Sequence, residues 1–221
     1  MSDIIGIGSS AWKSLITAAR LNLSAACMST RSDDPDGQSL VKNLEASGVD
    51  TSDLLVKTGC ASGDVPEPHP SEIDLAKIKD AKVLYLDGSF FDAAIHAARY
   101  AHLCGVRICL NTADPYDGIE RLLPFVNDLI VTESFALTIS GCGDLSEAAE
   151  TLMAQYRPNL VVVLKDEGGA LLAQYGQPVL SCPSSGRTDR EAFGGTFAAF
   201  ALLETTDALT RTRRALAAAA Q

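Results

Sequence analysis

The chain has no apolar run that approaches the roughly 18 consecutive residues of a membrane-spanning helix. It also begins without the basic segment and cleavage-like site of a secretory leader, because Met1-Ser2-Asp3 leads directly into the apolar run from Ile4 to Gly8. We therefore expect a cytoplasmic protein without membrane partners. Its 221 residues, 47% hydrophobic and 21% charged, predict one domain with a substantial core.

Metal ligands and phosphate-binding loops are also scarce. The six cysteines form no CxxC pair and there are only three histidines, so a zinc site has few ligands to draw on. We interpret the cysteines as reduced and mostly buried. Neither a GxxxxGK[ST] pattern nor a complete GxGxxG pattern occurs anywhere, which removes the usual motifs for a mononucleotide or dinucleotide.

Basic residues are outnumbered. The 18 Lys and Arg against 28 Asp and Glu give a net charge of −10. This balance opposes nucleic-acid binding, because a phosphate backbone is bound by clustered Lys and Arg. We expect no nucleic-acid partner, and we expect the acidic charge to favour monomers or weak self-association.

What the sequence does contain is a regular alternation of apolar strands and helical patterns. Continuous Val, Ile and Leu runs predict strands at 83–86, 106–110, 129–131 and 160–164. Between and after them we expect helices at 91–103, about 117–126 and 145–156, and two C-terminal helices. Such strands indicate a three-layer α/β/α sandwich with a mainly parallel sheet, whose ligands bind at the carboxyl ends of the strands.

The N-terminal part is less regular. Helical spacing at 14–21 precedes an apolar run at 23–28 that predicts a strand, and a second amphipathic helix is expected at 38–47. The stretch from Gly59 to Ser71 is rich in Gly, Pro, Asp and Ser and predicts a loop or linker. It is the best candidate for a boundary.

Several segments together carry a resemblance to a known family. Val83-Leu-Tyr-Leu-Asp-Gly88, the stretch 128–141, the stretch 161–170 and Thr188-Asp-Arg-Glu-Ala-Phe-Gly-Gly-Thr-Phe197 occur in the order and spacing of conserved segments of the ribokinase-like (PfkB-type) carbohydrate kinases. The last of them lies on the family's DTxGAGDxF signature. Gly8 to Leu21 resembles the family's GGNxxNxAxxxARLG sugar-binding helix, so gapped coverage runs from Gly8 to Ala220.

The resemblance implies a ribokinase-like domain over residues 1–221 and ATP-dependent phosphorylation of a sugar or nucleoside hydroxyl, with ATP and Mg²⁺. In the family, backbone N–H groups of a glycine-rich turn bind the phosphates, and the signature's last Asp accepts the hydroxyl proton. The implied positions fall into four groups. They are Gly195, at the place of the base, and Asp189 for catalysis; Asp166, Gly169, Gly194 and Thr196 for the nucleotide; Ser10, Lys13, Asp33 and Gly88 for the substrate; and Glu133 for the metal.

The same comparison shows departures from the family pattern. Gly195 has no side chain to take a proton, and Phe193 stands where backbone must approach a phosphate. The Thr and middle Gly of TxGxxG become Leu164 and Asp166, and the metal-associated NxxE keeps only the shifted Glu133. These losses predict absent or strongly reduced phosphoryl transfer.

Two lid segments of the family are also shortened, the second to 59–82, and we expect a loop or linker over 59–82 at the position of the lost lid segment. We therefore expect a lidless form with an open cleft near Gly88, and no dimer formed through a lid. Whether the chain is an enzyme stays open here. One alternative is an active sugar or nucleoside kinase that uses Asp189 or Glu191 as base, and another is a non-catalytic regulatory or scaffold protein. For Asp189 the favoured interpretation is a cap on the helix that follows it, because Asp is a good N-cap residue.

Overall fold

The computed structural model describes residues 2–61, 64–184, 187–203 and 207–220. Its main sheet has nine strands, seven of them parallel, with β10 antiparallel to β9 and β11 antiparallel to β10. In spatial order they are β11 (Leu180–Cys182), β10 (Ala170–Ala173), β9 (Leu160–Leu164), β8 (Asp128–Thr132), β7 (Arg107–Thr112), β6 (Val83–Leu86), β1 (Ile4–Ile7), β2 (Ala25–Cys27) and β4 (Val49–Asp50).

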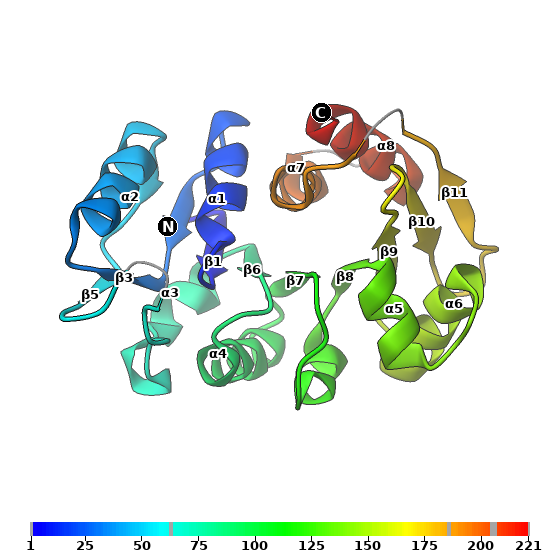
Figure 1. Ribbon diagram of the computed structural model, residues 1–221, viewed down its shortest axis with the longest axis horizontal. Helices are drawn as coiled ribbons and strands as arrows, with labels where there is room; N and C mark the ends of the chain where they lie inside the picture. The colour runs from blue at the N-terminus through cyan, green and yellow to red at the C-terminus, as the bar shows by residue number, and fades with distance from the viewer. Residues whose placement is uncertain (1, 62–63, 185–186, 204–206, 221) are drawn as a thin grey trace.

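Helices cover both faces of this sheet (Figure 1). One layer holds α1 (Ala11–Arg20), α2 (Pro35–Ala46), α7 (Arg190–Leu203) and α8 (Ala208–Ala219). The other holds α3 (Leu75–Asp80), α4 (Phe91–Leu103), α5 (Glu133–Ser140) and α6 (Leu145–Tyr156). Each layer encloses its own apolar core against the sheet, which explains why strands such as 160–164 are apolar at every position. The predicted three-layer α/β/α sandwich is confirmed.

The regular elements agree closely with the sequence analysis. The strands at 83–86 and 160–164 and the helices at 91–103 and 145–156 have the predicted bounds. The helix predicted at about 117–126 is wrong, because that stretch forms two short 3₁₀ turns, η2 (Ile119–Arg121) and η3 (Leu123–Phe125). Pro124 has no N–H group to donate within a helix.

The segment 59–82 is more ordered than a linker. It contains the 3₁₀ turn η1 (Pro70–Glu72) and helix α3, which begins after the capping residue Asp74. Ile73 and Ile78 from this segment are buried in the core that also contains α4. The expectation of a loop throughout 59–82 is therefore too broad, since its last part is helical.

A second, two-stranded parallel sheet was not predicted. It pairs β3 (Ser29–Ser32) with β5 (Leu54–Lys57), next to α2. Both strands are short, and neither has the continuous apolar character of the main strands. The absence of a lid remains a prediction. No helix in the described part of the chain is long and apolar enough to cross a membrane.

Candidate functional site

Asp87 joins two loops at the carboxyl ends of β1 and β6. Its Oδ2 accepts hydrogen bonds from the Ser10 N–H (2.6 Å) and the Ser10 hydroxyl (2.9 Å). Its Oδ1 accepts from the Ser89 N–H (2.9 Å) and the Ser89 hydroxyl (2.6 Å). Because Ser10 is the residue before α1, the Asp87 carboxylate also lies at the positive end of that helix dipole. Ser10, implied as a substrate ligand, is thus engaged in holding the fold.

Glycines make this junction compact. A Cβ on Gly8, whose φ is +144°, would overlap the Asp87 carboxylate. A Cβ on Gly88, whose φ is +86°, would lie 2.6 Å from Cβ of Thr112. Both positions therefore require glycine. The structure places Gly88 in tight packing between strands, with its α-carbon against Thr112.

All residues of the kinase-like signature after Asp189 lie inside α7. The helix begins at Arg190, and the Asp189 Oδ1 accepts a hydrogen bond from the Ala192 N–H (2.8 Å). The Phe193 N–H donates to the Asp189 carbonyl oxygen (2.8 Å). Asp189 therefore caps the helix, which was one of its two interpretations. Residues 193–199 are buried, and Thr196, implied as a nucleotide ligand, is only 2% exposed.

Gly194 and Gly195 pack against neighbouring elements. A Cβ at 195 would lie 2.9 Å from the Ser14 carbonyl carbon and closer still to its oxygen. A Cβ at 194 would overlap the Tyr85 hydroxyl and the Asn111 side-chain amide. These two glycines allow α7 to approach both α1 and the sheet closely, so neither faces an open phosphate site.

A buried polar cluster lies beneath this contact. The Tyr85 hydroxyl bonds to the Ser14 hydroxyl (2.8 Å) and accepts from the Asn111 Nδ2 (2.7 Å). Asn111 Nδ2 also donates to the Arg190 carbonyl oxygen (2.9 Å). Burial raises the pKa of Tyr85 well above its ordinary value, so the phenol stays neutral. The cluster ties β6 and β7 to the start of α7.

Glu191, the alternative base, lies beside cations. Its Oε1 accepts from the Arg190 Nη2 (3.1 Å) and lies 4.0 Å from the Lys13 Nζ. Arg190 also donates from Nη1 to the Asn111 carbonyl oxygen (3.0 Å). Lys13, implied as a substrate ligand, is half exposed and lies 5.7 Å from the Trp12 ring centroid. The Glu191 carboxylate is thus engaged with the side chain of the neighbouring Arg190.

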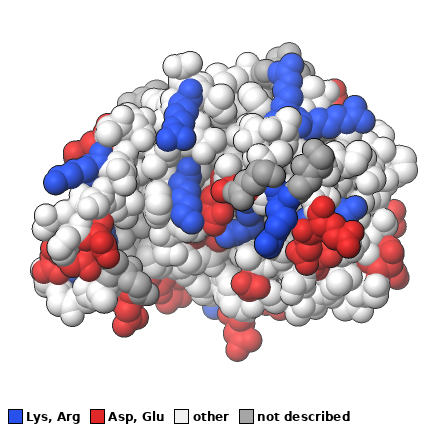
Figure 2. All heavy atoms as spheres, turned by 45° about the horizontal axis from the view of Figure 1, so that its top comes forward, with Lys and Arg blue, Asp and Glu red and all other residues white. Residues whose placement is uncertain are grey.

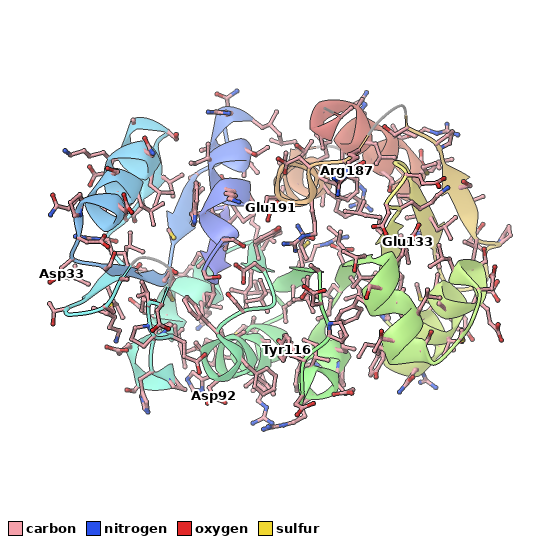
Figure 3. All side chains as sticks on the ribbon, in the orientation of Figure 1. Asp33, Asp92, Tyr116, Glu133, Arg187 and Glu191 are labelled. Carbon is pink, nitrogen blue, oxygen red and sulfur yellow. The ribbon has the colours of Figure 1, made fainter. Side chains whose placement is uncertain are left out.

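The remaining implied positions lie on other elements than α7. Asp166 is exposed in the turn between β9 and β10. Gly169 follows in the same turn, and a Cβ added to it would lie 3.2 Å from the Pro183 Cα. Asp33 is exposed just before α2, and Glu133 begins α5. Figure 3 shows Asp33, Glu191 and Glu133 spread across the width of the molecule. The structure thus places Ser10 and Gly88 at one junction, and it does not bring Asp33 or Glu133 to that junction.

The arrangement does not fit ATP with Mg²⁺. The N–H groups that should meet phosphate lie within α7, where the first ones are satisfied by Asp189. Within the described residues, no group of three or more His, Cys, Asp or Glu side chains could hold a metal ion. Figure 2 shows acidic side chains interspersed with Lys and Arg on the face turned toward the viewer, rather than one continuous basic surface.

The segment that follows β5 lies beside the expected cleft. In the segment that follows β5, the Pro66 carbonyl oxygen accepts from the Thr30 hydroxyl (2.8 Å). The Glu67 Oε2 and the Tyr116 hydroxyl are buried without a hydrogen-bond partner in the described chain. Burial and the charges of Asp87 and Glu67 raise the pKa of Tyr116. Glu67 and Asp87 thus both lie close enough to the Tyr116 hydroxyl to raise its pKa.

A cavity of about 360 Å³ beside this edge was missed from sequence. It lies between α1, α2 and β3, and Trp12, Leu40, Val65 and Phe90 supply its apolar lining. Two lining residues, Ser9 and Trp12, lie in the segment Gly8 to Leu21 that resembles the family's sugar-binding helix, and this was the available signal. The other lining residues lie on segments far apart in sequence, and no local pattern joins them.

Comparison with solved structures decides the fold family. A protein from E. coli assigned as a ribokinase, solved with ATP and Mg²⁺, superposes with a TM-score of 0.82 at 16% identity, covering 98% of this chain and 91% of that one. The fold is ribokinase-like. A PfkB protein from Polaromonas sp. JS666 gives 0.80 at 16% identity, covering 100% and 95%. Adenosine kinase from Anopheles gambiae, solved with a diadenosine tetraphosphate, gives 0.77 at 16% identity, covering 99% and 86%.

The likeness is one of structure alone. No family model matches the sequence, and no curated protein matches it either. The TM-scores establish the ribokinase-like fold. At 16% identity, the chemistry has to be argued from the residues of this chain.

Proposed function

We propose that this chain is a ribokinase-like protein in which ATP-dependent phosphoryl transfer to a sugar or nucleoside hydroxyl is lost or strongly reduced, while a small-molecule binding region is retained. The observation that carries the proposal is the position of Gly195. It lies inside α7 against the backbone of Ser14, where no side chain has room to reach a substrate hydroxyl.

Phosphoryl transfer depends on positioning and on groups that stabilise developing charge. Removal of a general base typically lowers rates by about 10²- to 10⁴-fold, and removal of one anion-binding donor by about 10²- to 10³-fold. Here the base position is glycine, and the Phe193 N–H bonds to the Asp189 carbonyl oxygen. Each feature alone lowers the rate, and together they favour a protein with no useful turnover.

An active kinase with a rearranged base has less support. The Asp189 Oδ1 accepts a hydrogen bond from the Ala192 N–H as a helix cap, and the Glu191 carboxylate forms an ion pair with Arg190. A general base needs a lone pair directed at the substrate hydroxyl. Both carboxylates are instead committed to contacts that hold the start of α7.

A calorimetric titration with ATP and Mg²⁺ tests the proposal at the binding step. We expect no saturable heat, or dissociation constants far above cellular ATP, because the overall charge of −10 and the buried signature oppose a polyanion. An ATP-binding member of the fold family serves as positive control under the same conditions. Saturable binding of MgATP by the unmodified chain would contradict the proposed loss of nucleotide binding. If Phe193→Ala or Asp166→Gly then bound MgATP more tightly, the result would favour a working nucleotide site.

A further inference from the structure

Two arginines and one aspartate lie together at the amino edge of the main sheet, opposite the edge that carries Asp87. Arg107 is the first residue of β7, and Asp128 is the first residue of β8. The Arg107 Nη2 donates to the Asp128 Oδ1 (2.7 Å), and its Nε donates to Oδ2. Arg211 lies next to this pair, because the charges of both residues act on its guanidinium group. None of the three is among the positions that the kinase resemblance implies.

The strand register places Arg107 and Asp128 on the face of the sheet that α7 and α8 cover. In the pairing of β7 with β8, Asp128 lies opposite Cys109. Arg107 comes two residues before Cys109, so its side chain lies on the same face of the sheet. Cys109 is buried in the core that contains Phe197 of α7 and Ala208 of α8. The pair therefore projects toward the start of α8.

The path of the last two helices brings Arg211 to the same edge. Helix α7 begins at the carboxyl edge, where the Asn111 Nδ2 donates to the Arg190 carbonyl oxygen (2.9 Å). Helix α8 ends at that edge too, since the Asp189 N–H donates to the Ala219 carbonyl oxygen (2.9 Å). Figure 1 shows the two helices on one face of the sheet. The beginning of α8, with Arg211 one turn inside, thus lies at the amino edge.

The Arg211 guanidinium group is only partly satisfied by the protein. Its central carbon lies 5.3 Å from the Phe197 ring centroid, so its flat face lies over an aromatic ring. Its Nε is buried and has no hydrogen-bond partner within the described residues. Both oxygens of Asp128 already accept from Arg107. A buried N–H group without an acceptor is costly, so an acceptor from solution would stabilise this edge of Arg211.

The charges around Arg211 are unbalanced. Two guanidinium groups lie beside one carboxylate, which leaves one positive charge in a partly buried place. The Asp128 side chain is 2% exposed, and that of Arg107 is 30% exposed. Burial, followed by the charge of Arg107, lowers the pKa of Arg211, as expected for a cation that lacks a counter-ion of its own.

Two other titratable groups near Arg211 supply little negative charge. Burial raises the pKa of the Cys109 thiol, so this group stays neutral. Asp207 is exposed, and as the cap of α8 its carboxylate accepts from the Thr210 N–H (2.9 Å) and hydroxyl (2.8 Å). Water and salt screen an exposed charge of this kind. An anion from solution would therefore complete the charge balance.

Guanidinium groups fit oxyanions. Each one presents N–H donors in a planar fork whose spacing matches two oxygens of a phosphate or a carboxylate. Here the donors come from two groups on different elements, β7 and α8. A planar carboxylate has two oxygens, enough for one fork, whereas a tetrahedral anion has oxygens for both. The arrangement therefore favours a tetrahedral oxyanion.

We propose that Arg211 and Arg107 bind a tetrahedral oxyanion, either inorganic phosphate or the phosphate group of a small monoester, at the amino edge of the sheet. Arg211 donates from Nε, and Arg107 donates from Nη1, which Asp128 does not use. The bound anion links α8 to β7. The site lies at the opposite edge from Asp189 and Asp87, so the proposal does not depend on the loss of phosphoryl transfer.

A calorimetric titration with inorganic phosphate tests the proposal. It is carried out at pH 7 and constant ionic strength, with chloride as the replacing ion, because screening alone alters such binding. We expect one site that half-saturates at about 1 mM, the range that two charged contacts supply. Sulfate should bind within about threefold of phosphate, and acetate at least about tenfold more weakly. Tighter binding of phenyl phosphate than of inorganic phosphate indicates a monoester as ligand, and weaker binding indicates the free ion.

Three substitutions test the contacts. Arg211→Gln removes the charge and the fork of donors, and it should weaken phosphate binding more than about tenfold. Arg213→Gln is the matched control, because Arg213 is exposed on the same helix, and it should bind as the unmodified chain does. Asp128→Asn keeps the shape of the side chain and removes its charge. It should tighten phosphate binding about three- to tenfold, an effect that a purely structural Asp128 would not produce.

Thermal unfolding provides a second measurement. In chloride alone, Arg211→Gln should melt within about 2 °C of the unmodified chain, because the lost contact with Phe197 is offset by removal of a charge beside Arg107. In about 30 mM phosphate the unmodified chain should gain about 4–8 °C. Phosphate also stabilises proteins by its exclusion from their surface, and the smaller gain of Arg211→Gln measures that part.

Three results would overturn the proposal. One is the absence of saturable heat with the unmodified chain up to about 20 mM phosphate, which would mean that water alone solvates the Arg211 Nε. The others are phosphate binding by Arg211→Gln as tight as that of the unmodified chain, and binding of acetate as tight as that of phosphate. The MgATP titration is repeated with Arg211→Gln, so that heat from this site is recognised. Failure here therefore leaves the proposed loss of phosphoryl transfer standing, and the reverse also holds.

Discussion

Gly195 lies against the backbone of Ser14, and this contact sets how closely helices α7 and α1 approach. A Cβ at position 195 would lie 2.9 Å from both the Cα and the carbonyl carbon of Ser14. Ser14 is itself fully buried, and its hydroxyl donates to the Glu191 carbonyl oxygen (2.8 Å) or bonds to Tyr85. The place of the family's base is therefore the centre of a helix–helix interface.

Substitution at Gly195 should destabilise the protein and restore no activity. Gly195→Ala forces α1 and α7 apart and should cost about 1–3 kcal/mol of unfolding free energy, as overpacking does. Gly195→Asp should cost more, because it also buries a carboxylate. Urea denaturation measures both. Gly143→Ala is the control, since a Cβ there meets nothing within 4 Å. Unchanged stability in Gly195→Ala would refute the packing argument.

Asp189 should behave as a helix cap. Asp189→Ala should lower the unfolding free energy by about 1 kcal/mol, because the Ala192 N–H loses its acceptor. Asp189→Asn keeps a side-chain oxygen and should retain most of that stability. A catalytic carboxylate would give a different pattern, with Asn as damaging as Ala in any transfer assay while thermal stability stays level. That pattern would return Asp189 to the role of base.

Removal of the Asp87 carboxylate should be among the more damaging single changes near the cleft. Its two oxygens accept four hydrogen bonds from Ser10 and Ser89. Asp87→Ala should cost about 2–4 kcal/mol, since bonds to a charged group contribute about 1.5–3 kcal/mol each and partners are left unpaired. Asp92→Ala, an exposed carboxylate at the start of α4, should change stability by less than about 1 kcal/mol. Equal losses in the two variants, measured by denaturation, would remove Asp87 from this structural role.

The particular elements show what the sequence could and could not predict. The strand Leu160–Leu164 and the helix Leu145–Tyr156 carry strong local periodicity, and their bounds were predicted from it. Helix α5 and the sheet of β3 and β5 are short, and tertiary pairing rather than local pattern defines them. The resemblance of 188–197 implies a glycine-rich turn at the start of a helix, with a helix cap as the other interpretation of Asp189. In the structure the helix begins at Arg190, directly after the capping Asp189, so that Gly194 and Gly195 are helical and Gly195 packs on Ser14.

Stability at acidic pH should depend on Asp3. Hydrogen bonds from Lys82 and Ser24 lower the pKa of this carboxyl from 3.8 to about 2. A lowered pKa in the folded state means that the stabilisation is present above about pH 4 and disappears as pH falls toward 2. Because the ion pair is partly exposed, we expect about 1 kcal/mol. Asp3→Asn should lower the free energy of unfolding by this amount at pH 7 and should weaken its decrease between pH 4 and pH 2. Glu167→Gln should do neither. If Asp3→Asn left the pH dependence of the free energy of unfolding unchanged, the proposed role of Asp3 would be contradicted.

The most direct test of the central claim is transfer of labelled γ-phosphate from ATP to sugars and nucleosides by the unmodified chain, followed as formation of the phosphorylated product. With Gly195 buried against Ser14, we predict no product above the background of a denatured sample, or a rate at least about 10⁴-fold below that of an active kinase of the same fold. Turnover near that of the active kinase on any of these substrates would contradict the claim.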